Sequence, residues 1–236
     1  MSILQNHVYI PFISDTGTIP PESCIFGQLL NVGALFFAIT AYVRYRQVQF
    51  LQSMVEIKLN KKWNISGLIL GILTSIGISI VGNFQETAIL FIHMIGACMA
   101  FGIGSWYIII QTRISFYFRH LYRKHPEFNI GRKMLYFRIF LSVCSLILTT
   151  IAAIFMVLAM SQFKGKNIAC WKEEDGGFIY KVIATFAEWI LGFCFLCYIL
   201  STTNEYKLIE YEEIRFKTKI SNGSVMETKA DNNSTL

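Results

Sequence analysis

Two long apolar stretches, Ile65–Gly82 and Ala88–Ile110, are separated by the five-residue segment NFQET. Neither stretch contains Asp, Glu, Lys or Arg. Because about 20 apolar helical residues cross the hydrocarbon core of a bilayer, each stretch spans or nearly spans it. Five residues leave no room for a domain between them. The pair therefore predicts an antiparallel helical hairpin whose tip lies in water on one side of a membrane.

Small residues recur every four positions in both stretches, at Gly67, Gly71, Ser75 and Ser79, and at Gly96, Ala100 and Gly104. Small residues at this spacing let membrane helices approach backbone to backbone. The alternative interpretation is that Gly and Ser are simply frequent in membrane helices. We favour helix packing because both stretches show the pattern.

Three further apolar segments give a predicted all-α, polytopic membrane bundle of five transmembrane helices, at 26–43, 65–82, 88–110, 135–160 and 178–200. Residues 1–25 form an N-terminal loop, and residues 201–236 a polar, largely disordered tail. The composition agrees, with 54% hydrophobic residues and a mean hydropathy of +0.48. The net charge of +6 does not indicate nucleic-acid binding, because the basic residues lie between apolar spans.

The distribution of Lys and Arg predicts the orientation of the bundle. The first connection, the third connection and the tail are rich in Lys and Arg, whereas the N-terminal segment and the hairpin tip have none. Basic residues stay in the cytosol, so we expect a luminal N-terminus and a cytosolic C-terminus. We expect Arg44, Arg46 and Arg138, near span ends, to snorkel toward the membrane surface. The basic connections would hold anionic lipid headgroups.

Six cysteines give no zinc-type spacing with His, so no metal or cofactor is expected. Only Cys24 and Cys170 lie in polar connections, both on the predicted luminal side. A disulfide between them and a pair of free thiols are both compatible with the sequence.

The tail carries two Tyr residues, each followed three positions later by a bulky aliphatic residue: Tyr206 with Ile209, and Tyr211 with Ile214. This spacing is similar to the tyrosine-based sorting signal that clathrin adaptors bind on endolysosomal cargo. The alternative is an interfacial helix that continues the last span.

Ionisable groups are rare within the apolar spans. Glu188 lies ten residues into the last span and His93 lies near the predicted luminal end of the third. An acid at this depth points to a functional site or to a structural hydrogen bond between helices. His93 is a packing histidine or a proton sensor. A Glu188–His93 contact is conceivable, although their predicted depths differ by over a helical turn.

The predicted luminal loops contain the other candidate functional residues, Asp15, Asn83, Gln85 and Glu86. Asp15, Glu22 and Glu86 are all acids that would gather near one headgroup or remain solvated. No phosphate-binding Gly-rich loop, GxSxG turn or HExxH motif is present, so we expect no enzyme activity.

Several motifs together resemble the damage-regulated autophagy modulator (DRAM) family. They are PFISDTGTIPPESCIFG from Pro11, the segment Tyr42–Tyr45, NFQE at Asn83–Glu86, and Glu188-Trp189. Their order and spacing extend over Pro11–Ile209. The segment EIKLNK at Glu56–Lys61 most resembles the second member of the family. The family pattern has six spans, so one expectation is that this chain lacks the first.

The resemblance implies a multispan protein of lysosomal and late endosomal membranes that promotes autophagy and bears on cell death. Members of the wider superfamily organise phosphoinositide kinases and remodel lipid-anchored proteins, which favours lipid binding. A proton-coupled transporter that uses Glu188 is the first alternative, although the sequence shows no broken-helix signature. A lipid-remodelling enzyme that uses luminal acids is the second. No feature of the sequence points to a particular oligomeric state.

Overall fold

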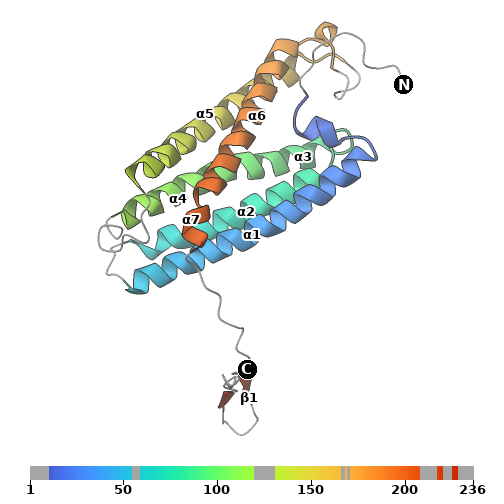
Figure 1. Cartoon of the computed structure of the whole chain (residues 1–236). Helices are drawn as coiled ribbons and strands as arrows, with labels where there is room; N and C mark the ends of the chain where they lie inside the picture. The colour runs from blue at the N-terminus through green and yellow to red at the C-terminus, as the bar shows by residue number, and fades with distance from the viewer. Residues whose placement is uncertain are drawn as a thin grey trace, which may run out of the picture.

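The computed structural model describes residues 11–54, 59–119, 131–165, 168, 171–207, 217–219 and 225–227. Within these ranges, five helices are long and apolar enough to cross a membrane (Figure 1). The predicted class, a helical membrane bundle with five spans, is confirmed.

The spans are α1 (Glu22–Met54), α2 (Lys61–Asn83), a third span in three parts, α5 (Arg132–Gln162) and α6 (Phe178–Ser201). The third span comprises α3 (Leu90–Ala97), the π-helical segment η2 (Cys98–Ile103) and α4 (Gly104–Phe118). The shorter elements are η1 (Ser14–Gly17), η6 (Glu173–Asp175), α7 (Thr203–Tyr206), β1 (Lys217–Lys219) and β2 (Val225–Glu227). The two strands pair antiparallel.

The helices extend beyond the apolar segments that predicted them. The first span, predicted at 26–43, runs as α1 from the residue after Pro20–Pro21 to Met54. Apolar residues mark the depth of the hydrocarbon, whereas backbone hydrogen bonding continues into the water phase wherever the sequence tolerates helix. At the start of α2, Asn60 ends the connection as an N-cap, and its side chain accepts from the Lys62 N–H at 2.9 Å.

The small-residue stripes lie at helix contacts. A Cβ added to Gly71 would lie 2.6 Å from Ala41 Cβ of α1, and the Ser75 hydroxyl donates to the Ala34 carbonyl at 2.7 Å. On another side of α2, Gly77 packs closely against the third span. Gly96 of the third span in turn lies close to Ile80 of α2. Packing therefore explains the spacing, as predicted.

The bundle buries polar as well as apolar side chains and exposes many large apolar ones, as expected of a protein whose solvent is lipid. Arg138, Lys181, Ser105 and Ser145 are among the most buried side chains, whereas Phe91, Ile179 and other large apolar side chains point outward. In Figure 1, α1 and α2 run side by side, and α5 and α6 form a second pair that meets the first through the third span. We call the end with the loop 84–89 the hairpin end, and the end with α7 the tail end.

Candidate functional site

A pocket of about 190 Å³ lies at the hairpin end, among the third span, α5 and α6. One part of its wall is polar, formed by Ser14, Glu86, His93 and Glu188. The rest is mostly apolar and is formed by Phe12, Val81, Met94, Ala97, Cys98, Phe101, Gly102, Thr149, Ala152, Ala153, Met156 and Leu191. We call it the carboxyl pocket. A pocket with one polar and one apolar part suits an amphipathic ligand.

The loop before α1 closes the pocket on one side. The Phe12 N–H donates to Asp15 Oδ2 at 3.0 Å, which fixes the turn that begins η1. The Trp189 indole of α6 donates to the Pro11 carbonyl at 2.9 Å and holds the loop against the last span. The Ser14 hydroxyl donates to Glu86 Oε2 at 3.2 Å. The loop is therefore attached to two other elements that bound the pocket.

Asp15 and Glu86 form a carboxyl pair. Burial, then the hydrogen bond to Asp15 and its negative charge, raise the pKa of Glu86 from 4.5 to about 9. The nearby Lys181 and the hydroxyl of Ser14 act in the opposite direction, less strongly. The raised pKa favours the protonated form of Glu86 at neutral pH.

Lys181 of α6 supplies the positive charge of this site. Its side chain is fully buried, and its Nζ lies 3.4 Å from Asp15 Oδ2. The ammonium also lies 5.5 Å from the centroid of the Phe12 ring and 5.1 Å from that of Trp171, within cation–π range. The sequence analysis missed this residue. The signal was a lysine three residues inside an apolar span, shortly after Phe178 and Tyr180.

Glu188 and His93 contribute the groups deeper in the membrane. Glu188 lies two helical turns beyond Lys181 on α6, so both face the same side of the helix. His93 Nδ1 lies 2.7 Å from the Phe84 carbonyl, which can only accept, so Nδ1 carries a proton. Its Nε2 is then available as an acceptor in the neutral ring. The structure brings both residues to one pocket.

A π-helical segment forms part of the pocket wall, because Cys98, Phe101 and Gly102 belong to η2. Such segments widen a helix locally and occur often at functional sites. The sequence did not predict this interruption of the third span.

A buried ion network joins four elements at the tail end. Glu205 of α7 pairs with both Arg44 of α1 and Arg138 of α5. Arg44 also donates to Gln111 of α4 at 3.3 Å, and Arg138 donates to the Ser115 hydroxyl at 2.9 Å. The prediction that Arg44 and Arg138 snorkel is wrong, because they are 3% and 1% exposed. The buried carboxylate of Glu205 compensates their positive charges. Arg46, by contrast, is exposed.

Comparisons with known proteins place the chain in a family. Residues 1–209 match the domain described as the Frag1/DRAM/Sfk1/Cwh43P N-terminal domain. The chain belongs to this family. The resemblance stated above is thereby confirmed. No solved structure matches the chain.

The relatives within the Frag1/DRAM family include two named "DNA damage-regulated autophagy modulator protein 2". The Rattus norvegicus protein is 36% identical over 216 residues, which is 88% of this chain and 76% of the relative. The Homo sapiens protein is 37% identical over 210 residues, 85% and 73% of the two chains. "Modulator of macroautophagy TMEM150B" of Xenopus tropicalis is 33% identical over 214 residues, 90% and 79%. These names describe modulators rather than enzymes, which agrees with the expected non-enzymatic role.

The structure brings some of the predicted site residues of this family member together and separates others. Glu86, His93 and Glu188 line the carboxyl pocket and Asp15 lies beside Glu86, whereas Glu22 is exposed. Asn83 accepts from Asn31 of α1 at 3.1 Å and therefore connects α1 to α2. The Gln85 carbonyl accepts from Ala88 and Ile89 and forms the hairpin turn.

Other predicted residues of this family member lie partly outside the described ranges. Cys24 is exposed and Cys170 lies outside the described residues, so the disulfide stays a prediction. Of the sorting signals, only Tyr206 is described, and its hydroxyl lies 3.5 Å from the Thr40 carbonyl of α1. The other three positions, Ile209, Tyr211 and Ile214, lie outside those residues. Within the described part of the chain, no group of three His, Cys, Asp or Glu residues could hold a metal ion.

Proposed function

We propose that this chain is a non-enzymatic modulator of autophagy in lysosomal and late endosomal membranes, with a bearing on cell death. Family membership supports the first part, because the relatives are named as modulators of autophagy. The two tyrosine signals support the location, with a clathrin adaptor as the partner in sorting. The positions of Lys and Arg support a luminal N-terminus and a cytosolic tail.

The carboxyl pocket is the proposed site of action, and its ligand is a lipid. The observation that carries this proposal is the shape of the pocket wall: Glu86, His93 and Glu188 converge at one part, and apolar residues form the rest. A lipid head would hydrogen-bond to the polar groups while its hydrocarbon contacts the apolar wall. Since the raised pKa of Glu86 favours its neutral form and the charge of Lys181 offsets that of Asp15, these three groups favour an uncharged, hydroxyl-bearing head.

Substitution of Glu188 tests this function. In cells that lack the endogenous protein, we expect the wild-type chain to restore the turnover of autophagosomes, and Glu188→Gln to restore little of it while reaching the same membranes at the same level. Glu22→Gln, at an exposed acid near the same end, is the matched control. Full restoration by Glu188→Gln would exclude a role for the pocket carboxyl. Restoration by neither variant would contradict a specific role of the pocket and would point to a general requirement for acids at the hairpin end.

A proton-coupled transporter is the second candidate function. The interruption of the third span by η2, beside Glu188 and His93, favours it, because non-α segments at ion sites are a feature of transporters. It predicts proton-driven uptake of a small solute into proteoliposomes, which Glu188→Gln abolishes. A variant that no longer transports the solute but still restores normal autophagosome turnover would show that the two functions are separate.

A further inference from the structure

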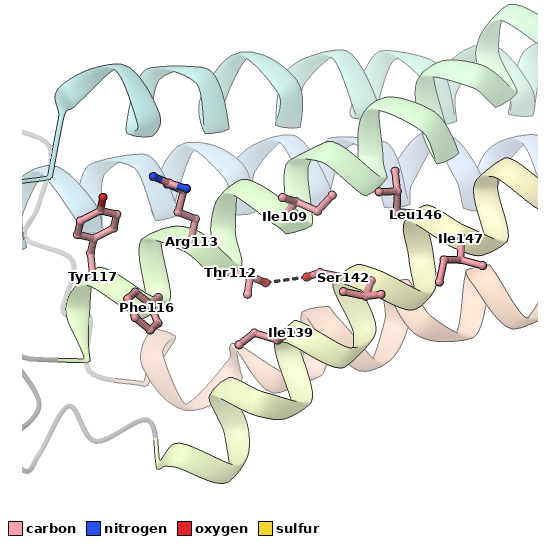
Figure 2. A pocket seen from close by; sticks show the side chains of 10 residues that line it. Ile109, Thr112, Arg113, Phe116, Tyr117, Ile139, Ser142, Leu146 and Ile147 are labelled. Carbon is pink, nitrogen blue, oxygen red and sulfur yellow. Dashed lines mark hydrogen bonds between the residues drawn. The ribbon is translucent and has the colours of Figure 1, made fainter.

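A groove of about 550 Å³ lies on the outer surface between α4 and α5, away from the carboxyl pocket. Figure 2 shows that both helices supply its walls. On α4 the lining positions run from Ile109 to Tyr117, and on α5 from Ile139 to Ile147, each with spacing i, i+3, i+4, i+7 and i+8. The groove is thus one face of each helix. Its volume lies within the range of ligand pockets.

The length of the groove matches one leaflet of a bilayer. Eight residues separate its first and last positions on each helix, which corresponds to roughly 12 Å of helix. One leaflet contributes roughly 15 Å of hydrocarbon. The walls are mainly Ile, Val, Leu and Phe side chains, several of them half exposed, such as Val143 at 53%. An acyl chain lying along the groove would cover them.

The floor of the groove offers no unsatisfied polar group to water. The Thr112 and Ser142 hydroxyls lie 2.8 Å apart and form the hydrogen bond drawn in Figure 2. Thr112 also contacts the Tyr198 hydroxyl at 2.9 Å, and Ser142 donates to the Arg138 carbonyl at 2.8 Å. The two small side chains make the groove deep, and their mutual bonding keeps it compatible with hydrocarbon.

Arg113 provides a fixed positive charge midway along the α4 wall of the groove, between Ile109 and Tyr117. Its Cζ lies 4.4 Å from the ring centroid of Trp63 on α2 and 5.8 Å from that of Tyr117. Stacking on these rings holds the guanidinium in place while its edge N–H groups stay available for bidentate bonds to phosphate. Among the described residues, no carboxylate forms an ion pair with Arg113. Arg113 follows the apolar stretch that ends at Ile110, at the level of the headgroups.

We propose that the groove between α4 and α5 binds one phospholipid with an anionic headgroup. Its acyl chain lies along the groove, and Arg113 pairs with its headgroup, whose net negative charge is not balanced by a choline cation. This site is separate from the carboxyl pocket and does not depend on the function proposed for it.

The test is native mass spectrometry of the lipid-stripped protein, titrated with phosphatidylserine and phosphatidylcholine of identical acyl chains. We expect the serine lipid to bind at a concentration about fivefold lower, the effect of one favourable charge near a membrane surface. Arg113→Gln removes this preference, and Arg113→Lys keeps part of it. Val143→Phe, which places a larger side chain in the groove at an exposed position, weakens the binding of both lipids. Arg46→Gln, at an exposed arginine outside the groove, leaves binding unchanged.

Three results would overturn the proposal. The first is equal affinity of the wild-type chain for both lipids. The second is a loss of preference in Arg46→Gln as large as that in Arg113→Gln, which would indicate diffuse surface charge. The third is full competition by water-soluble glycerophosphoserine, which would indicate a phosphate site without a lipid chain. If a lowered melting temperature shows that Arg113→Gln does not fold, the lipid binding of Val143→Phe and Arg113→Lys decides whether the proposal holds.

Discussion

Lys181 Nζ lies 3.4 Å from Asp15 Oδ2, and this ion pair connects the last span to the loop before the first. Both side chains are buried, with 0% and 6% of their surface exposed. A lysine at this position in a membrane helix is stable only because a carboxylate and two aromatic rings surround it. The pair therefore fixes the wall of the carboxyl pocket that carries Ser14 and Glu188.

Replacing Lys181 with Met is expected to destabilise the protein strongly. The substitution keeps the apolar stem but leaves Asp15 as a buried, uncompensated charge, which typically costs about 3–5 kcal/mol. Thermal unfolding in detergent measures the effect. Lys164→Met, at an exposed lysine before the same span, is expected to change little. The double variant with Asp15→Asn should recover part of the loss, and a double variant no better than Lys181→Met would contradict the pairing.

The stability of the bundle is expected to fall as pH rises, because of Glu86. Burial and the neighbouring Asp15 raise the pKa of Glu86 to about 9, above the ordinary value of 4.5. Between these values the folded state binds more protons than the unfolded state, so its stabilisation is complete below pH 4.5 and is lost as pH rises toward 9. The slope is at most about 1.4 kcal/mol per pH unit. Melting temperatures from pH 5 to pH 9 report it.

Glu86→Gln should flatten this pH profile, because an amide imitates the protonated acid. Near pH 5 the variant is expected to melt close to the wild-type chain, whereas near pH 9 it should be the more stable of the two. Glu22→Gln, at an exposed acid, should keep the wild-type profile. Parallel profiles for Glu86→Gln and the wild type would show that another group titrates.

The membrane spans could be predicted because hydrophobicity and length depend on local sequence alone. The stripe containing Gly71 and Ser75 was also readable, since helical spacing determines which residues share a face. The acids of the carboxyl pocket were predicted one by one, from their rarity in or beside apolar spans. Their convergence was not required by the sequence, because Ser14 and Glu86 are 72 positions apart.

The buried cations show what the sequence could not reveal. Arg44 and Arg138 lie near span ends, where a long basic side chain usually reaches the headgroups. Whether such a side chain snorkels or stays inside depends on a partner, and Glu205 lies 161 and 67 positions away. Because Glu205 lies in α7, beyond the last predicted apolar segment (178–200), the sequence alone indicates an ordinary acid of the tail. The fold of the whole bundle decides this contact.

Glu205→Gln is expected to destabilise the tail end. Arg44 and Arg138 would then face each other without a carboxylate, at a cost of about 3–5 kcal/mol. Since Glu205 holds α7 against α1 and α5, limited proteolysis just after α6 should also become faster. Glu205→Asp keeps the charge and should lose less, whereas Glu173→Gln, at an exposed acid, serves as the control. Unchanged cleavage and melting in Glu205→Gln would exclude a structural role for the network.

Gly77→Ala is expected to push α2 away from the third span. A Cβ at this position would lie 2.5 Å from Met99 Cβ, 2.6 Å from Ala100 N and 2.8 Å from Gly96 O. Two of these atoms belong to the backbone, so no side-chain rotation relieves the clash, and overpacking of this kind costs about 1–3 kcal/mol. Gly33→Ala is the matched control, because nothing lies within 4 Å of its Cβ and alanine favours helix by up to about 1 kcal/mol. The melting temperature should therefore fall in the first variant and stay level or rise in the second. Because Met99 and Ala100 belong to η2, Gly77→Ala should also alter the carboxyl pocket, whereas equal melting of both variants would show that the close approach at Gly77 is not required.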